Sequence, residues 1–178
     1  MTLASEVIDD LCHTLSSSMA SNNWMLISDR VMGGISSGTI RREVVSGRNA
    51  IRMQGEVSLE NGGGFLQIAI DLGDDGRETD ARNWTGIQLD VLGNDQSYNL
   101  HLRTTDIKRS WESYRQSFTA HSIWQTIELP FSDFTPHRTE YPLNITHLRR
   151  IGIVAIGKQF EADISIADIR FYGSKVCV

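Results

Sequence analysis

The chain has 178 residues, of which 40% are hydrophobic and 22% are charged, and its formal net charge is −5. These values are typical of one folded domain that buries a core without a metal or a disulfide, and they exclude a disordered chain. An acidic balance also disfavours nucleic-acid binding, because phosphates attract basic surfaces. The short basic pairs Arg41-Arg42, Lys108-Arg109 and Arg149-Arg150 are therefore expected to be solvated surface.

The cysteines and the N-terminal residues bear on the compartment. Cys12 and Cys177 lie near opposite ends of the chain, in no metal-binding or redox spacing, so we expect both to be unpaired thiols. Met1–Asp10 contains three acids and no Lys or Arg, unlike an export signal or a presequence. No apolar run approaches the roughly 20 residues that span a bilayer. These features predict a cytoplasmic protein that does not insert into membranes.

The first predicted element is an amphipathic helix. Leu3, Val7, Leu11 and Leu15 recur every four residues, which predicts a helix over Thr2–Met19. The serines and asparagines that follow end it. The expected organisation is a helix in residues 1–22 that packs on a β-sandwich formed by residues 23–178.

After Trp24 the hydrophobic period changes to two, and nine strands are predicted, which indicates an all-β sandwich or barrel. Ile151–Ile156 is apolar throughout, as in a central strand covered on both sides, with the N-terminal helix as one candidate cover. The alternation slips at Ala167-Asp168, which predicts a β-bulge. The predicted strands are Thr39–Val45, Ala50–Leu59, Phe65–Leu72, Gly86–Leu92, Tyr98–Thr105, Tyr114–Thr119, Trp124–Leu129, Leu148–Ile156 and Ile164–Tyr172.

Catalytic and metal-binding motifs are absent, so no cofactor is expected. The acidic segment Asp71–Asp80 does not fit the EF-hand register, because its third position is Gly73 and its twelfth is Arg82. A solvated loop is the simpler interpretation, and a calcium site of another kind is the alternative. Gly62-Gly63-Gly64 is expected to form a tight turn or bulge before Phe65.

The segment Asp29-Arg30-Val31-Met32-Gly33-Gly34 has two interpretations. An Asp-Arg pair followed by two glycines can form a rigid corner with an internal ion pair held by charge-assisted hydrogen bonds. The same residues can also form a recognition loop. We expect this segment to lie near the Asn61-Gly62-Gly63 turn and to form with it the binding end of the sandwich.

Two segments resemble a known family. Ser28–Ser36 is similar to the D-R-V-M-G-G-x-S motif of the CIA30 family, named after complex I intermediate-associated protein 30, and Gly55–Phe65 is similar to its G-x-V-S-x-E-N-x-G-G-F segment. The resemblance extends from about Trp24 to Gly173. It implies a galactose-binding-domain-like jelly-roll sandwich and, for mitochondrial members, a chaperone role in assembling respiratory complex I.

Three functions follow as hypotheses. The first is a non-catalytic assembly factor or chaperone that binds a protein partner, such as a subunit of a membrane complex. The second is a carbohydrate or small-ligand module with one polar sheet face. If Leu100, Leu102, Ile127 and Leu129 face the core, then the outward side chains include His101, Arg103, Trp124 and Glu128.

The third hypothesis is an enzyme that uses Asp29, His101 or Glu128 as an acid or base. No spacing in the sequence fixes two of these groups together, so this hypothesis is disfavoured.

Overall fold

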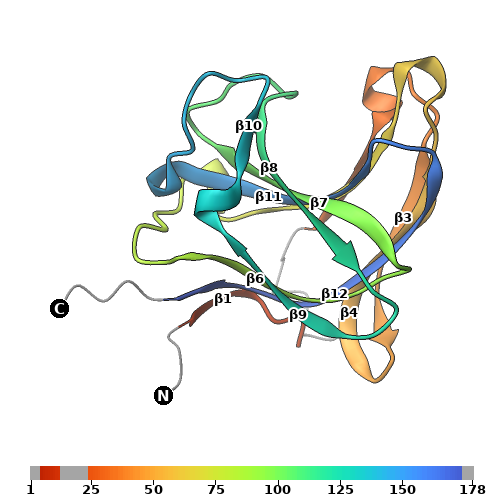
Figure 1. Cartoon of the computed structure of the whole chain (residues 1–178), viewed down its shortest axis with the longest axis horizontal. Helices are drawn as coiled ribbons and strands as arrows, with labels where there is room; N and C mark the ends of the chain where they lie inside the picture. Colours follow the sequence, from red (N-terminus) through yellow and green to blue (C-terminus); the bar gives the residue numbers. More distant parts are fainter. Residues whose placement is uncertain (1–4, 13–23, 174–178) are drawn as a thin grey trace.

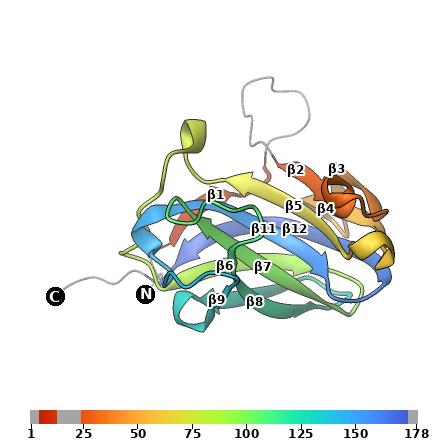
Figure 2. The same ribbon diagram turned by 90° about the horizontal axis from the view of Figure 1, so that it is seen from above.

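The computed structural model describes residues 5–12 and 24–173, which form two antiparallel sheets packed face to face (Figures 1 and 2). The strands of sheet A are β1 (Ser5–Asp9), β3 (Ser37–Val45), β4 (Arg48–Val57), β6 (Gly86–Leu92), β9 (Gln125–Pro130) and β12 (Phe160–Tyr172). The strands of sheet B are β2 (Met25–Ser28), β5 (Phe65–Asp71), β7 (Gln96–Thr104), β8 (Ser113–Ala120), β10 (Thr135–His137) and β11 (Leu148–Ile156).

Sheet A has the order β3-β4-β12-β6-β9, with β1 also paired to β12, and sheet B has the order β10-β8-β7-β11-β5-β2. Short 3-10 turns occur in the connections, at Asp29–Met32, Glu60–Gly62, Asp74–Gly76, Phe131–Asp133 and Ile145–His147. All nine predicted strands are present, and the β-sandwich is confirmed. Within the described residues, no helix is long and apolar enough to cross a membrane.

The core lies between the two sheets because alternate side chains of each strand point inward. Ile87, Leu89 and Val91 of β6 are fully buried, as are Leu100 and Leu102 of β7. The predicted bulge is confirmed as well. The register between β12 and β6 shifts between Ile166 and Asp168.

The central position predicted for Ile151–Ile156 is also confirmed, since β11 lies between β7 and β5. Its outward residues Gly152 and Val154 are nevertheless buried. A Cβ atom on Gly152 would lie 3.0 Å from the amide group of Gln67 on β5. Neighbouring side chains such as Gln67 thus provide outer cover for this strand.

The predicted N-terminal helix is wrong where the structure describes it. Ser5–Asp9 is strand β1, which pairs with the second half of β12 (Figure 1, red beside dark blue). β4 pairs with β12 only over Phe160–Ile166, so the backbone groups further along that edge need another partner, and β1 supplies it. Residues 10–12 are not helical either, and residues 2–4 and 13–19 of the predicted helix lie outside the described residues.

Asp9 fixes the end of β1. Its buried carboxylate accepts hydrogen bonds from the Leu11 N–H (2.9 Å) and from the Trp24 indole N–H (2.8 Å). Leu11 has a positive φ of 53° and is buried in the core. Next to it, Cys12 is an exposed free thiol, whereas Cys177 lies outside the described residues.

Tyr98 connects the two sheets through the core. The side chain is fully buried, and its hydroxyl donates to Asn94 Oδ1 (2.6 Å) while accepting from the Asp163 N–H of β12 (2.9 Å). Burial raises the pKa of Tyr98 to about 12, so the hydroxyl keeps its proton at neutral pH. This proton forms the hydrogen bond to Asn94 Oδ1.

Tyr98→Phe should lower the free energy of unfolding by about 1–3 kcal/mol, because the Asp163 N–H and the Asn94 carbonyl lose their partner. Chemical denaturation measures the change. Tyr172→Phe is the matched control, since no hydrogen bond of its hydroxyl occurs among the described residues, and it should change stability by less than about 0.5 kcal/mol. Equal stability of the two variants would contradict the connection between the sheets.

Candidate functional site

Asp29 is the centre of one end of the sandwich. Its side chain is completely buried, Oδ1 accepts from the Ser36 N–H (3.0 Å), and Oδ2 accepts from Ser36 Oγ and from the N–H groups of Gly64 (2.6 Å) and Phe65 (3.3 Å). Burial acts to raise the pKa of Asp29, but these hydrogen bonds outweigh it and hold the pKa below its ordinary value. The carboxylate therefore joins the β2–β3 loop to the β4–β5 turn.

Two glycines allow this close approach. A Cβ atom on Gly34 or on Gly63 would lie 2.4 Å from the Asp29 carboxylate, closer than any side chain can come. Ser36 adds a second link, since its Oγ accepts from the Ser58 N–H (2.9 Å). The two segments that we expected to lie together therefore do so (Figure 1, upper right; Figure 2, right). The corner is held by the hydrogen bonds of Asp29, whereas the expected ion pair between Asp29 and Arg30 is wrong: none occurs in the described part of the chain.

The other sequence-predicted residues here have more limited contacts. Arg30 Nε donates to the Ser36 carbonyl (3.1 Å) across the loop. Gly33 ends the 3-10 turn with a positive φ of 88°. Asn61 and Gly62 also have positive φ, 56° and 71°, and are exposed on the turn before β5. These residues shape the two loops, and a binding role for them stays a prediction.

Sequence reasoning missed the most exposed feature of this end. Val31 is 75% exposed, Met32 64%, Ile35 44% and Leu59 51%, and all four lie on the two loops joined by Asp29. We call these four residues the apolar end. The signal was present in the sequence, because large aliphatic residues sit beside glycines in segments with no strand periodicity.

His101 and Arg103 project from β7 on the outer face of sheet B, as expected. Arg103 donates to the carbonyls of Ser110 (3.0 Å) and Arg109 (2.9 Å), so it supports the β7–β8 loop. His101 is only 8% exposed, and its Nε2 has no hydrogen-bond partner. Burial, together with the charge of Arg115, lowers the pKa of His101 to about 3, so the ring is neutral at pH 7.

Trp124 and Glu128 do not join that face. They belong to β9 and the residue before it, and β9 is the edge strand of sheet A, so outward side chains there point to the opposite side of the sandwich. Trp124 Nε1 donates to the Val45 carbonyl (3.1 Å), and the Arg48 guanidinium lies 5.0 Å from its ring centroid. The polar face that combined them with His101 is therefore wrong.

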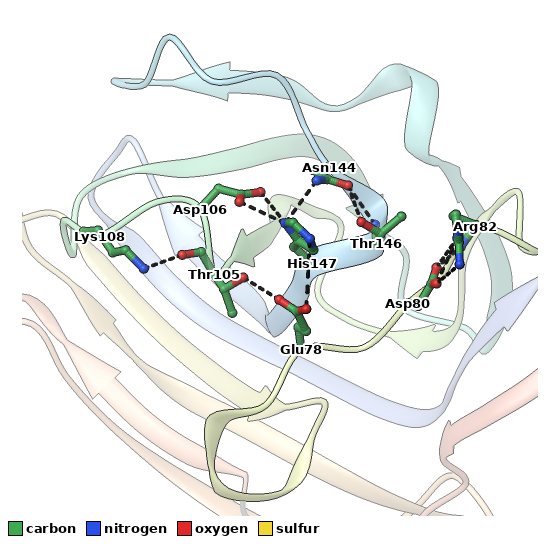
Figure 3. Close-up of polar contacts among 9 residues, drawn as sticks. All are labelled: Glu78, Asp80, Arg82, Thr105, Asp106, Lys108, Asn144, Thr146 and His147. Carbon is green, nitrogen blue, oxygen red and sulfur yellow. Dashed lines mark hydrogen bonds and ion pairs between the residues drawn. The ribbon is translucent and has the colours of Figure 1, made fainter.

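A shallow hollow lies at the other end of the sandwich, where the β5–β6, β7–β8 and β10–β11 loops meet (Figure 3). His147 Nδ1 contacts Asp106 Oδ1 (2.9 Å) and Asn144 Nδ2 (3.0 Å), and its Nε2 lies 4.0 Å from Glu78. The hydrogen bond to Asp106 raises the pKa of His147. The hollow is lined by Glu78, Asp80, Arg82, Thr146 and His147.

These polar groups satisfy one another. Thr105 Oγ1 donates to Glu78 (2.8 Å), and Arg82 pairs with Asp80 (2.6 Å). Across residues 5–12 and 24–173, no group of three or more His, Cys, Asp or Glu side chains is arranged to hold a metal ion. Asp71 of the acidic segment pairs with Arg150 (2.6 Å). The segment 71–80 thus contains ion-paired and exposed carboxylates rather than a ligand cage.

The three acid–base candidates of the enzyme hypothesis lie on three separate parts of the sandwich. Asp29 is buried and accepts hydrogen bonds at one end, His101 lies on the outer face of sheet B, and Glu128 is exposed on sheet A. General acid–base chemistry requires such groups within hydrogen-bond reach of one substrate. This arrangement does not provide that.

Asp29→Ala should lower the free energy of unfolding by about 2–4 kcal/mol, because several buried donors lose their acceptor. Asn61→Ala should cost about 1 kcal/mol or less, since only its left-handed backbone is affected. Asp29 contributes stability above its unfolded pKa, and this is lost as pH falls through its lower folded pKa. Acid titration should therefore separate wild type from Asp29→Ala at neutral pH but not at low pH, and a constant difference would contradict this account.

For His147, an NMR titration of the imidazole should give a pKa above the ordinary value of about 6.5. Asp106→Asn should return it toward that value, because the anionic partner is removed. His147 contributes stability below its unfolded pKa and loses it as pH rises through the folded pKa. A pKa unchanged in Asp106→Asn would show that the contact does not persist in solution.

Several solved structures with a similar fold are carbohydrate-binding modules. The family 11 module of cellulosomal cellulase Lic26A-Cel5E of Clostridium thermocellum has a TM-score of 0.73 at 18% identity and covers 98% of this chain and 97% of its own. A structure of the family 11 module from that organism in complex with a β-1,3-1,4-mixed-linked tetrasaccharide has a TM-score of 0.72, again at 18% identity, with 98% of both chains covered.

The family 30 module of cellulase Cel9D-Cel44B of the same organism is more distant, with a TM-score of 0.64 and 11% identity over 86% of this chain and 92% of its own. Identities this low support a shared fold and nothing finer. A comparison with curated protein sequences finds no match. The sequence profile of complex I intermediate-associated protein 30 matches residues 13–166, which is most of the chain, and so this chain belongs to the CIA30 family.

Proposed function

We propose that this chain is a non-catalytic binding module that captures a protein partner through its apolar end, in the manner of an assembly factor. The observation that carries the proposal is the placement of Val31, Met32, Ile35 and Leu59, exposed by 44–75% on two loops that Asp29 holds together. Membership in a family named after an assembly-associated protein supports the same conclusion.

The exposed aliphatic side chains of the apolar end are the physical reason for proposing a partner there. Single apolar residues on a surface are ordinary, but a group of them on adjacent loops marks a contact surface. Val31 and Met32 lie in the Asp29 turn, so their backbone is already fixed before a partner arrives. Binding then costs little ordering entropy and removes apolar area from water.

The second candidate is a carbohydrate-binding module. The similar structures are carbohydrate-binding modules, one with a bound tetrasaccharide, and the outer face of sheet B is polar. Sugar rings, however, stack well on aromatic faces, and the rings of Tyr98, Tyr114 and Phe118 on β7 and β8 are in the core. This arrangement favours the protein partner.

The double variant Val31→Asp/Met32→Asp should capture its partner from native extract far more weakly than wild type does. Charging two buried interface anchors should cost at least about 2 kcal/mol of binding, or roughly 30-fold in affinity. The measurement is quantitative mass spectrometry of captured proteins, followed by titration of the purified partner. Stability should change little, because both side chains are exposed.

Val44→Asp is the matched control, since Val44 is equally apolar and exposed but lies on β3, near the far hairpin. It should retain full capture. Equal loss in the control, or undiminished capture by the double variant, would reject the apolar end as the binding surface. Binding of the mixed-linked tetrasaccharide by a chain that captures no protein would favour the second candidate instead.

A further inference from the structure

Four basic side chains gather at the β10 edge of sheet B. His101 of β7 lies directly beside Arg115 of β8, and Arg115 in turn lies beside Thr135 of β10. His137 shares the outward side of β10 with Thr135, and Arg138 follows it in the turn, with a positive φ of 55°. We call His101, Arg115, His137 and Arg138 the basic group.

No acidic side chain neutralises this group. Among the described residues, none of the four makes an ion pair, and Arg115 uses only its Nε, which donates to Ser113 Oγ (2.9 Å). Burial lowers the pKa of Arg115, as does the charge of Arg138, and burial together with both arginines lowers the pKa of His137. Arg115 and Arg138 therefore bring two positive charges together here in a chain whose net charge is −5, while the His101 ring beside them is neutral.

His101 gives the clearest sign of an absent partner. More than nine-tenths of the residue is buried, yet its Nε2 has no hydrogen bond. A buried polar atom without a partner costs free energy, and most such atoms in native proteins are satisfied. The ring is not part of the core either, since its neighbours Leu100 and Leu102 point inward and His101 points outward.

We infer that the basic group binds a carboxylate of an acidic segment in the protein partner. Arg115 keeps four Nη hydrogens free, enough to grip both carboxylate oxygens. Arg138 adds charge from the exposed turn, and His101 lies directly beside Arg115 in the sheet. The inference rests on the proposed function, because it assigns the carboxylate to a protein.

A peptide fits this surface better than an acidic sugar. The outward residues of strands β7 and β8 include no aromatic ring for a sugar to stack on, because Tyr98, Tyr114 and Phe118 face the core. The exposed rings of Trp111 and Tyr141 lie in the loops beyond these strands. An extended Glu-rich segment needs no such platform. Its side-chain carboxylates can reach the arginines while its backbone stays in water.

The test is fluorescence anisotropy of a dye-labelled octaglutamate peptide with the full chain. Wild type should bind it, and Arg115→Gln should weaken binding roughly tenfold or more, the loss expected for a charge-assisted hydrogen bond. Arg138→Gln, at an exposed position, should also weaken binding and replaces the first variant if Arg115→Gln does not fold. Arg41→Gln, at an exposed arginine on β3, is the matched control and should bind like wild type.

Absence of peptide binding, or equal loss in Arg41→Gln, would overturn the inference. So would tighter binding of an oligogalacturonate, which carries its carboxylates on a sugar, or of inorganic phosphate. The double variant Val31→Asp/Met32→Asp should still bind octaglutamate. If the proposal for the apolar end is wrong, only the partner-capture experiment gives the contrary result. If the inference for the basic group is wrong, the peptide-binding experiment gives it, so the two proposals are tested separately.

Discussion

The buried carboxylate of Asp29 is the interaction on which the β2–β3 end of the sandwich depends. Removing a charge from water costs several kcal/mol unless hydrogen bonds replace the lost hydration. Here Ser36, Gly64 and Phe65 supply them, and they come from the β2–β3 loop and from the β4–β5 turn. Because β2 and β5 belong to sheet B whereas β3 and β4 belong to sheet A, one side chain fixes the corner at which the chain passes between the sheets.

The fold separates two kinds of chemistry on its surface. Val31 and Met32 extend from the Asp29 corner, at the end of the sandwich where β5 begins. His101 and Arg115 lie on the face of sheet B, toward its β10 edge. A partner that contacts both surfaces would bring apolar groups to one and carboxylates to the other. Such a division provides affinity through buried area and specificity through charge.

The sequence predicts those features that depend on residues close together in the chain, and it does not predict those that depend on contacts between distant segments. Alternation is local, and it predicted all nine long strands, whereas β2 is too short to alternate and β10 contains Pro136. The spacing of Leu3, Val7 and Leu11 fits a helix, but pairing with the open edge of β12 is a tertiary contact that no local pattern reports. Alternation likewise shows which side chains of β9 are outward, but not to which of two sheets β9 belongs, which is why Glu128 was misassigned.

The two interpretations of the Asp29 segment, a rigid corner and a recognition loop, are compatible in this structure. Within Asp29–Gly34, the aspartate and Gly34 face inward to form the corner, and Val31 and Met32 are left outside by the same turn. Rigidity is what makes exposed aliphatic groups effective, because a mobile loop would lose entropy on binding. The corner has no need of Val31 and Met32 for its own hydrogen bonds, and this is the physical reason for our proposal that a partner contacts them.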